Sequence, residues 1–373
     1  MEKLSLASIK KKNFSDVYHF IYHHPDASRQ VIAQGLHMSL PTLSQHLNTL
    51  LEEGLIRKSG QLESQIGRKA AAYSVIADAR VAIGVEIIRS RVMIVFVNLY
   101  GEAAACRRVP AVFEDSAAYY ERICKEIQEF TEEQRYTGQQ ILGAVFSVQG
   151  LVSADKRTMT FDRILHMEHM SADLFETSLG YPCSLCHDAE GAAAHTMWNR
   201  RSTENAVYLS ISDHLGGAVI INGRIWHGNC GKSGTMEHMT LYPGGKKCYC
   251  GQYGCAECYC STEALLEDGE ELAAFFQGVR NHEKDREARW RHFLEDLALF
   301  LNNIHRVTDC EIILGGHISV FLKEEDFGYL HRQLREHTAF PEPEPFVVPG
   351  SQEDHEIPIG AALDRIREFL NQI

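Results

Sequence analysis

The sequence predicts an α/β protein with a small helical head at its N-terminus and a larger body of two similar β-rich halves. Residues 1–76 hold nine Lys and Arg against six Asp and Glu, so the head carries +3 in a chain whose net charge is −13, and the remainder carries −16. Apolar residues in the head recur three and four positions apart, as on one face of a helix. From Val81 onward, short β-rich runs alternate with helical segments, and polar residues follow several of those runs.

Three helices are predicted in the head. Residues 13–24 place their apolar side chains on one helical face and end at a proline. Ser28 can cap a second helix over residues 29–34, and a third helix begins at Ser39. Leucines line one face of the third helix, whereas its other face carries short polar side chains that suit base edges and phosphates in a major groove. The candidate DNA contacts on that face are Thr42, Ser44, Gln45, His46 and Asn48.

A basic hairpin is predicted after these helices. Residues 55–58 and 68–75 are typical of two strands, and residues 59–65 of the turn that joins them. Arg68 and Lys69 place two cations near the tip, as contacts to a minor groove or to phosphates require. The head therefore has a winged helix-turn-helix pattern. A helical protein-docking module is the alternative, but the basic wing favours DNA.

The body is predicted to form two lobes, residues 77–197 and 198–373, with a last helix at about 358–373 that returns to the first lobe. Ligand groups at the ends of strands in both halves imply a cleft between them. Asn222 with Gly223 is a strong hairpin turn, and a second turn is expected at Gly216-Gly217. The predicted strands are 81–88, 91–98, 103–109, 141–148, 181–186, 206–211, 218–221 and 311–316, and the predicted helices are 116–131, 189–198, 262–275 and 284–305.

Composition excludes several classes of protein. A content of 45% hydrophobic and 23% charged residues is typical of soluble globular domains. No run of about 18 apolar residues occurs, and the N-terminal segment has no signal-peptide pattern, so we expect a cytoplasmic protein without a membrane partner. The eleven cysteines favour metal ligands and buried thiols over a disulfide framework. Cys183 and Cys186 have redox-motif spacing, but they lie in a predicted strand, so we interpret them as core residues.

One cluster has metal-ligand spacing. Zinc prefers thiolate and imidazole ligands in a tetrahedron, and two glycines let the backbone turn tightly enough for three cysteines to converge. The alternative is four unrelated residues, which this spacing disfavours. Cys258 and Cys260 lie close enough to compete, but we interpret them as bystanders. The predicted zinc ligands are His238, Cys248, Cys250 and Cys255.

These motifs together resemble the ROK family of repressors and sugar kinases, over residues 14–373. The most specific match is Cys-x-Cys-Gly-x-x-Gly-Cys-x-Glu at residues 248–257, preceded by His238. Asp188-x-x-Gly-Ala-Ala-Ala, Leu314-Gly-Gly and Ile359-Gly-Ala-Ala support it. The resemblance implies an actin-like, ribonuclease-H-type body of two lobes. With a winged helix in front, the chain is similar to the repressor branch of the family.

The resemblance also implies that phosphoryl transfer is lost. The kinases of this family carry Asp-x-Gly-Gly-Thr where this chain has Glu86–Ser90, so branched side chains fill the space that phosphates would approach. Their second loop, Gly-Thr-Gly-x-Gly-Gly-Gly, corresponds to Ser212–Ala218, in which Asp213 adds negative charge. We therefore predict no enzymatic activity, with a sugar kinase bearing a DNA-binding head as the alternative.

A sugar site is implied in the same way. Asp188 matches the catalytic base of the kinases, which also binds a sugar hydroxyl, and His238 matches a histidine that touches both zinc and sugar. His187 and Thr235 replace an asparagine and a glutamate that contact sugar in the family. Asp188 could instead only cap a helix, and Glu257 could be a solvated carboxylate. The predicted effector contacts are Gly150, His187, Asp188, Thr235, His238 and Glu257.

The resulting hypothesis is a DNA-binding regulator of carbohydrate genes, most simply a repressor. A homodimer or dimer of dimers would bind a double-stranded palindromic operator at the nucleoid, and a sugar or sugar phosphate would shift the population of DNA-competent arrangements. Zinc would be structural. The alternative within this fold is a regulator with a vestigial sugar pocket, controlled by a partner protein. Stabilisation by sugars separates the two readings.

Overall fold

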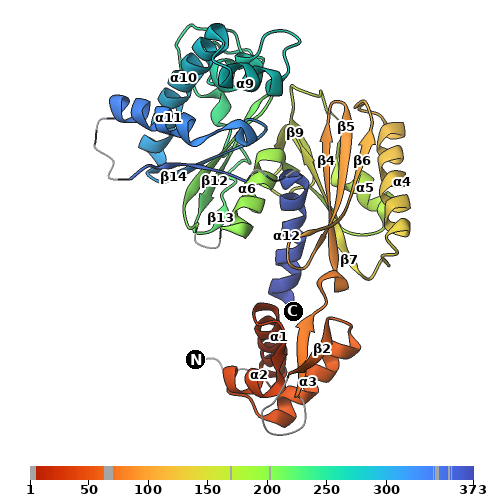
Figure 1. Cartoon of the computed structure of the whole chain (residues 1–373). Helices are drawn as coiled ribbons and strands as arrows, with labels where there is room; N and C mark the ends of the chain where they lie inside the picture. Colours follow the sequence, from red (N-terminus) through yellow and green to blue (C-terminus); the bar gives the residue numbers. More distant parts are fainter. Residues whose placement is uncertain are drawn as a thin grey trace.

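The computed structural model describes residues 6–62, 70–168, 170–200, 203–338, 340, 344–351, 353 and 355–373. It has three parts: the head, at the bottom of Figure 1, and the two lobes of the body, which lie side by side above it (Figure 1). The chain ends beside the head, because the last helix runs from the junction of the lobes toward α1 (Figure 1). Among the described residues, no helix is long and apolar enough to cross a membrane.

The head contains the three predicted helices and a small antiparallel sheet in the order β1-β3-β2. Ser28 and Ser39 cap the second and third helices by accepting from the N–H groups of Val31 and Thr42. The first helix begins earlier than predicted, and strand β2 continues through part of the predicted turn. The bounds are α1 Leu6–His23, β1 Ala27–Ser28, α2 Arg29–Gly35, α3 Leu40–Glu52, β2 Ile56–Leu62 and β3 Ala70–Val75.

The first lobe is built on a five-stranded sheet in the order β10-β7-β4-β5-β6. Strand β5 pairs antiparallel with both β4 and β6, whereas β7 pairs parallel with β4, and β10 pairs parallel with β7. Helices α4 and α5 cover one face (Figure 1). The bounds are η1 Ala77–Ala79, β4 Val81–Ile88, β5 Arg91–Asn98, β6 Ala103–Pro110, α4 Ala117–Glu133, β7 Ile141–Val148, β8 Leu151–Val152, β9 Met159–Phe161, α5 Ala172–Leu179 and β10 Cys183–His187.

The second lobe repeats that sheet order as β13-β12-β11-β14-β15. Gly216 and Gly217 lie inside β12 rather than in a turn, because they pair with Ser210 and Leu209 of β11. The predicted helix 262–275 is split into α8 and α9 by a loop that holds Gly269 at a positive φ of 78°. The bounds are β11 Ala206–Ile211, β12 Leu215–Ile221, β13 Arg224–Ile225, η2 Met236–His238, α7 Glu257–Cys260, α8 Thr262–Leu265, α9 Leu272–Arg280, α10 Lys284–Thr308, β14 Glu311–Gly315, η3 Ser319–Phe321, α11 Glu324–His337 and β15 Val347–Pro349.

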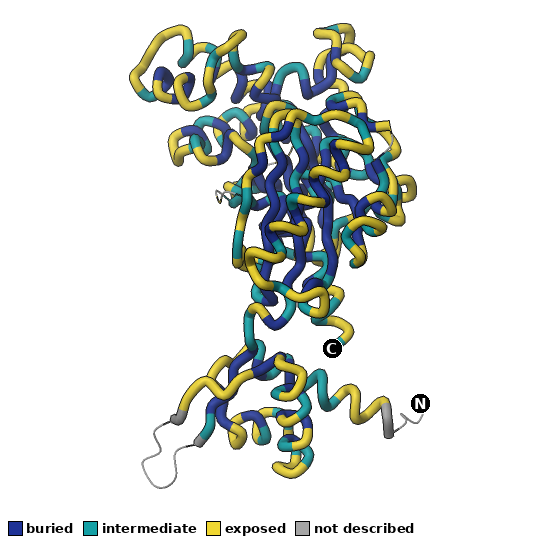
Figure 2. Tube along the Cα trace, turned by 90° about the vertical axis from the view of Figure 1, so that its right-hand side faces the viewer, coloured by how far each residue is buried: buried dark blue, intermediate teal, exposed yellow. Residues whose placement is uncertain are grey.

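Two helices, α6 (Asp188–Asn199) and α12 (Glu356–Gln372), cross at the junction of the lobes. A Cβ on Gly360 of α12 would lie 1.7 Å from the carbonyl oxygen of Gly191 of α6, so glycine is required for this close approach. Helix α12 also packs against β4, β5 and β7. The first sheet is therefore buried on both faces, as the dark strands in Figure 2 show.

The head packs on the body through aromatic side chains of α1. The Tyr22 hydroxyl donates to the carbonyl oxygen of Leu99 at 2.7 Å, and its ring stacks on Tyr100 with centroids 4.8 Å apart. Tyr18 meets Phe369 of α12 edge-on. Trp198, in the last turn of α6, donates its indole N–H to the Tyr100 carbonyl oxygen at 2.8 Å. One apolar core thus joins the head to both junction helices.

Candidate functional site

A cleft of about 520 Å³ lies between the lobes. The first lobe contributes the end of β7, the β8–β9 hairpin and the start of α6. The second lobe contributes the start of β12, residues 230–238 and Tyr249. Polar and aromatic side chains line it together with backbone, as in pockets for small polar ligands. Of the predicted effector contacts, those on the cleft wall are Gly150, His187, Asp188, Thr235 and His238.

Asp188 reaches the cleft because β10 pairs in parallel with β7 and ends at the start of α6. Its Oδ1 accepts from the Ala189 N–H at 2.7 Å and lies 3.1 Å from His187 Nδ1. His187 is the N-cap residue, and its Nδ1 accepts from the same N–H at 3.2 Å. Asp188 therefore holds the first turn of α6 and faces the cleft as well.

Glu257 is not on the cleft wall. The residue is 4% exposed, and its carboxylate lies 2.7 Å from His214 Nδ1 and accepts from the Leu215 N–H at 2.8 Å. His214 does line the cleft. Burial lowers the pKa of His214, but the hydrogen bond and charge of Glu257 outweigh burial and raise it. Glu257 therefore contacts a cleft residue, His214, which the sequence analysis did not single out.

Glu237 is a second wall residue that the sequence analysis missed. It lies on η2, is 8% exposed, and its Oε1 is 3.8 Å from His238 Nε2. Its Oε2 has no hydrogen-bond partner among the residues that the structure describes. Burial raises the pKa of Glu237 to about 7. The available sequence signal was its place directly before His238.

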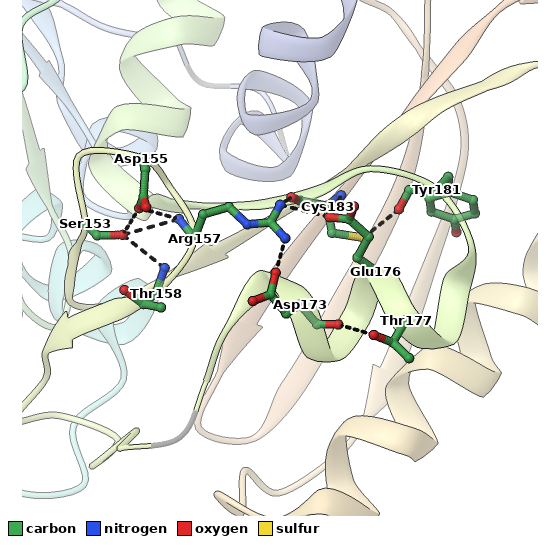
Figure 3. Close-up of polar contacts among 9 residues, drawn as sticks. All are labelled: Ser153, Asp155, Arg157, Thr158, Asp173, Glu176, Thr177, Tyr181 and Cys183. Carbon is green, nitrogen blue, oxygen red and sulfur yellow. Dashed lines mark hydrogen bonds and ion pairs between the residues drawn. The ribbon is translucent and has the colours of Figure 1, made fainter.

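The β8–β9 hairpin that forms one wall is held by Arg157. Figure 3 shows its guanidinium between α5 and β10. Nη1 donates to Glu176 Oε2 and to the Cys183 carbonyl oxygen, both at 2.8 Å, and Nη2 pairs with Asp173. The neighbouring Lys156 pairs with Asp364 of α12. These ion pairs fix the hairpin relative to the first sheet and to α12.

The cysteine loop gathers the four predicted metal ligands. Their ligand atoms all lie within 4.8 Å of one another, and a tetrahedral zinc site with Zn–S bonds near 2.3 Å separates its sulfur atoms by about 3.8 Å. Cys248 Sγ is 3.7 Å from His238 Nδ1, and Cys250 Sγ is 3.7 Å from Cys255 Sγ. His238 therefore turns Nδ1 to the thiols, which leaves Nε2 toward Glu237.

The backbone and the chemistry of this loop both suit a metal. Gly254 has a φ of 78°, and a Cβ there would lie 1.7 Å from the Tyr242 carbonyl oxygen. Burial raises the pKa of Cys255 to about 11, so a cation is needed to hold the thiolate, and burial lowers the pKa of His238, which favours the neutral imidazole. Cys258 and Cys260 are outside the four-residue cluster, and Cys260 is buried in the core of the second lobe.

Only some of the predicted DNA contacts on α3 are exposed in the structure. Gln45 and Asn48 are exposed on α3, whereas Thr42 and Ser44 are half-buried with local hydrogen bonds. His46 is 3% exposed and packs edge-on against Phe14 of α1, so it is a core residue of the head and not a contact to DNA in this conformation. Arg68 and Lys69 lie outside the described residues.

A cation that was not predicted adjoins this face. Arg29 of α2 donates from Nη1 to Ser44 Oγ at 3.1 Å. It stands beside the exposed part of α3 and adds positive charge to it.

The two segments that the sequence analysis compared with the phosphate loops of kinases, Glu86–Ser90 and Ser212–Ala218, each hold an acidic side chain. Burial raises the pKa of Glu86, on β4, to about 7. Asp213 accepts from the Thr262 hydroxyl at 3.3 Å, and Ser212 Oγ accepts from the His317 N–H at 3.0 Å.

The chain matches two families. Residues 16–57 match a winged helix-turn-helix DNA-binding family, and residues 82–364, most of the chain, match the ROK family. The chain belongs to the ROK family. It is 24% identical over 262 residues to the N-acetylglucosamine repressor of Escherichia coli O6:H1, which covers 69% of this chain and 64% of that repressor.

Regulators and kinases both occur among the similar ROK proteins. An N-acetylmannosamine kinase of Vibrio cholerae is 28% identical over 59% of this chain and 76% of the kinase. A solved ROK family transcriptional regulator, described as a homolog of the E. coli MLC protein, superimposes with a TM-score of 0.75 at 20% identity. It covers 98% of this chain and 97% of its own, so the head and both lobes share one fold with it.

Proposed function

We propose that this protein is a DNA-binding transcriptional repressor of carbohydrate genes whose DNA affinity responds to a sugar or sugar derivative bound between the lobes. The observation that carries the proposal is the direct packing of a winged helix-turn-helix head on the helices of a sugar-kinase-like cleft. The site of action is the cytoplasm, at the nucleoid when the operator is bound.

The cleft supports a polyhydroxylated ligand. Asp188 offers a carboxylate, His187 and His238 offer imidazoles, and backbone at Gly150 completes the wall. Tyr249 adds an aromatic ring that packs edge-on against His238. Such a mixture of acceptors, donors and a ring is what sugar hydroxyls and C–H faces require.

Sugar phosphorylation is disfavoured by the loops that would bind ATP. Glu86 and Asp213 place acidic groups in the two segments that correspond to phosphate loops, where phosphoryl groups need backbone donors and cations. Ser212 and Asp213 are already engaged with His317 and Thr262. We therefore propose a regulator without kinase activity.

Zinc is proposed as a structural ion held by His238 and the three cysteines. When bound, it supplies four fixed bonds and no reaction. The protein's own contribution is to hold His238 so that Nδ1 faces the thiols while the ring lines the cleft. A metal in the loop would in this way set the position of one effector contact.

Helix α6 gives a physical route from the cleft to the head. It begins with Asp188 at the cleft and ends near Trp198, which holds Tyr100 against Tyr22 of α1. A sugar that moves the start of α6 would also move Trp198 and Tyr100, against which α1 of the head packs. In a homodimer or dimer of dimers, this shift would change how two α3 helices meet a palindromic operator.

The proposed DNA face combines Gln45 and Asn48 of α3 with the wing, where Arg68 and Lys69 would reach phosphates or a minor groove. Selection of duplexes from a random library by the purified protein tests it. We expect a palindromic motif, and Gln45→Ala with Asn48→Ala should lose sequence preference. Enrichment of no motif would contradict DNA-sequence recognition.

A thermal-shift screen of the zinc-replete protein against sugars, sugar phosphates and ATP tests the effector site. A sugar-specific rise that Asp188→Ala abolishes would support the sensor, since ligands of the native state stabilise it by mass action. A rise with ATP would instead favour a kinase.

One observation favours a second candidate function. Two predicted sugar contacts are already engaged: Glu257 with His214, and the Thr235 hydroxyl with the carbonyl oxygen of Lys232. No response to any sugar, combined with specific DNA binding, would point to a repressor controlled by a partner protein.

A further inference from the structure

A second cavity, of about 320 Å³, lies at the junction of the lobes and shares no wall residue with the cleft. Its wall comes mainly from α6, α12, β13 and Lys156 of the β8–β9 hairpin, and we call it the junction pocket. Gly191 and Gly360, which let the two helices touch, leave open space beside their contact. Sites for small molecules begin near 300 Å³, so the junction pocket is large enough for one.

The junction pocket differs in charge from the cleft. Its wall has three side chains that are cations at neutral pH against two carboxyl groups, whereas the cleft wall has two such cations against three carboxyl groups. A positive pocket in a chain whose net charge is −13 favours an anionic ligand. The charged residues of the junction pocket are Lys156, Arg224, Arg367, Glu190 and Asp364.

The carboxyl groups of the junction pocket are already paired, whereas two of its cations are not. Lys156 pairs with Asp364, and His227 pairs with Glu190. Within the part of the chain that the structure describes, the guanidinium groups of Arg224 and Arg367 form no ion pair and no hydrogen bond. Each guanidinium offers five N–H donors in a planar fork, a geometry that suits phosphate oxygens.

Arg367 is the less exposed of these two cations. It is half-buried on α12, and its guanidinium lies 5.7 Å from the centroid of the Trp198 ring. Burial lowers the pKa of Arg367, and the charge of Asp364 offsets this only in part. A partly desolvated cation without a direct partner gains more from a bound anion than an exposed cation does. Because Trp198 also holds Tyr100, an anion here would lie beside the contact between the head and the body.

The charge and the directions of the cations indicate the class of ligand. We propose that the junction pocket binds a phosphate group, with Arg367 as its main contact and Arg224 and Lys156 as further contacts. Two unpaired guanidinium groups match the charge of about −2 on a phosphate monoester, whereas a carboxylate would neutralise only one of them. The three cations come from α12, the second lobe and the first lobe, so one ligand would join all three. This inference goes beyond the proposed function, since neither sugar nor DNA enters it.

Calorimetric titration of the zinc-replete full chain tests the junction pocket with inorganic phosphate and glycerol 3-phosphate, and with glycerol as the uncharged match. At about pH 7.5 a phosphate monoester carries close to two negative charges, and about 0.15 M salt screens weak attraction to the surface. We expect saturable binding of at least one phosphate compound and no binding of glycerol. The tighter of the two phosphate compounds shows whether the natural source is free phosphate or an ester.

Three variants assign the binding to this pocket. Arg367→Gln should weaken phosphate binding about tenfold or more, since it removes a hydrogen bond between charged groups. Arg224→Gln should weaken it about twofold to fivefold, because this side chain is exposed. Arg332→Gln is the matched control: it makes the same change of charge at an exposed residue of α11 outside the pocket, and phosphate binding should be unchanged.

Several results would overturn the inference. They are the absence of saturable binding by both phosphate compounds, undiminished binding by Arg367→Gln, and an equal loss in Arg332→Gln, which would indicate attraction by net charge alone. Because Arg367 packs near Trp198, thermal unfolding accompanies each titration. If Arg367→Gln does not fold, Arg224→Gln decides, and undiminished binding there overturns the inference. None of these results contradicts the proposed function, which places its effector in the cleft.

Discussion

The cysteine loop and the cleft lie next to each other, but the chain brings their residues together in different ways. The loop takes all four candidate ligands from one short segment, His238–Cys255, so the spacing of the chain brings them together. The cleft takes its wall from segments far apart in both lobes, which meet through the fold. His238 belongs to both. We therefore expect that the structure of the loop requires only the metal. The structure of the cleft should require the metal, the two sheets and the junction helices.

The largest expected effect is loss of the metal. Cys255→Ser should abolish stoichiometric zinc and destabilise the protein by ~4 kcal/mol, as removal of a metal site typically does, which corresponds to a fall in Tm of about 10 °C. Zinc analysis and thermal unfolding measure both. Cys106→Ser, at an exposed cysteine outside the cluster, is the control and should change neither. Full zinc content in Cys255→Ser would contradict the assignment of Cys255 as a metal ligand.

Asp188→Asn should weaken sugar binding in the cleft and leave zinc binding by the cysteine loop unchanged. A hydrogen bond to a charged group contributes about 1.5–3 kcal/mol, so sugar affinity should fall about tenfold to a hundredfold. Zinc content should stay that of the unmodified protein, because Asp188 is not in the metal cluster. Calorimetric titration with the best sugar of the thermal screen, followed by zinc analysis of the same sample, measures both. Undiminished sugar affinity would remove Asp188 from the site.

The response of the head to sugar should depend on its contacts with the junction of the lobes and not on the cysteine loop. Tyr22→Phe keeps the ring stacked on Tyr100 and removes the hydroxyl that donates to the Leu99 carbonyl oxygen, a loss of ~1 kcal/mol. Sugar and zinc binding should be unchanged, whereas the effect of sugar on DNA affinity should weaken. Anisotropy of labelled operator with and without sugar checks this. An unchanged sugar effect would mean that the lobes signal to the head by another route.

The smallest expected effect is a pH dependence at the contact between the lobes. Glu190 of α6 lies 2.8 Å from His227 Nδ1. Burial raises the pKa of Glu190, but the bond to His227 and its charge outweigh burial and hold it below 4.5. Because the folded-state pKa is depressed, the pair stabilises the protein above about pH 4.5, and this contribution is lost as the pH falls.

Thermal unfolding of Glu190→Gln across the acid range measures this contribution. The variant should be less stable than the unmodified protein near neutral pH, and the gap should close on acidification. Loss of zinc at low pH affects both proteins equally, so it cancels in the difference. A gap that is independent of pH would mean that Glu190 acts by shape and not by charge.

Prediction from sequence succeeded where patterns are local and periodic. The strands from Val81 to Val148, the capped helices of the head and the Asn222-Gly223 turn match the structure closely, because alternation, caps and turn residues act over a few positions. Gly216-Gly217 was misplaced in a turn because pairing with β11, a tertiary contact, keeps the glycines in a strand. The helix expected over 262–275 is interrupted where Gly269 takes a positive φ.

In the candidate site, too, local patterns were predictable from the sequence and tertiary contacts were not. The four metal ligands were predicted from spacing, and Asp188 from its match to the catalytic base of the related kinases. His46 was assigned to the polar face of α3, but its ring fills space against Phe14, which helical periodicity alone cannot reveal. Glu257 was assigned to the cleft, but it pairs with His214 from a different segment. Glu237 was missed because its burial and its free oxygen are properties of the assembled cleft.

The most direct test of the central claim is the DNA affinity of the protein with and without sugar. A duplex selected by the protein itself is titrated by fluorescence anisotropy, alone and with the sugar that best stabilises the protein. Coupling between two sites typically changes affinity 5-fold or more, so we predict a change of about that size in the unmodified protein and none in Asp188→Asn. An operator affinity that stays constant while the sugar saturates the cleft would contradict the account.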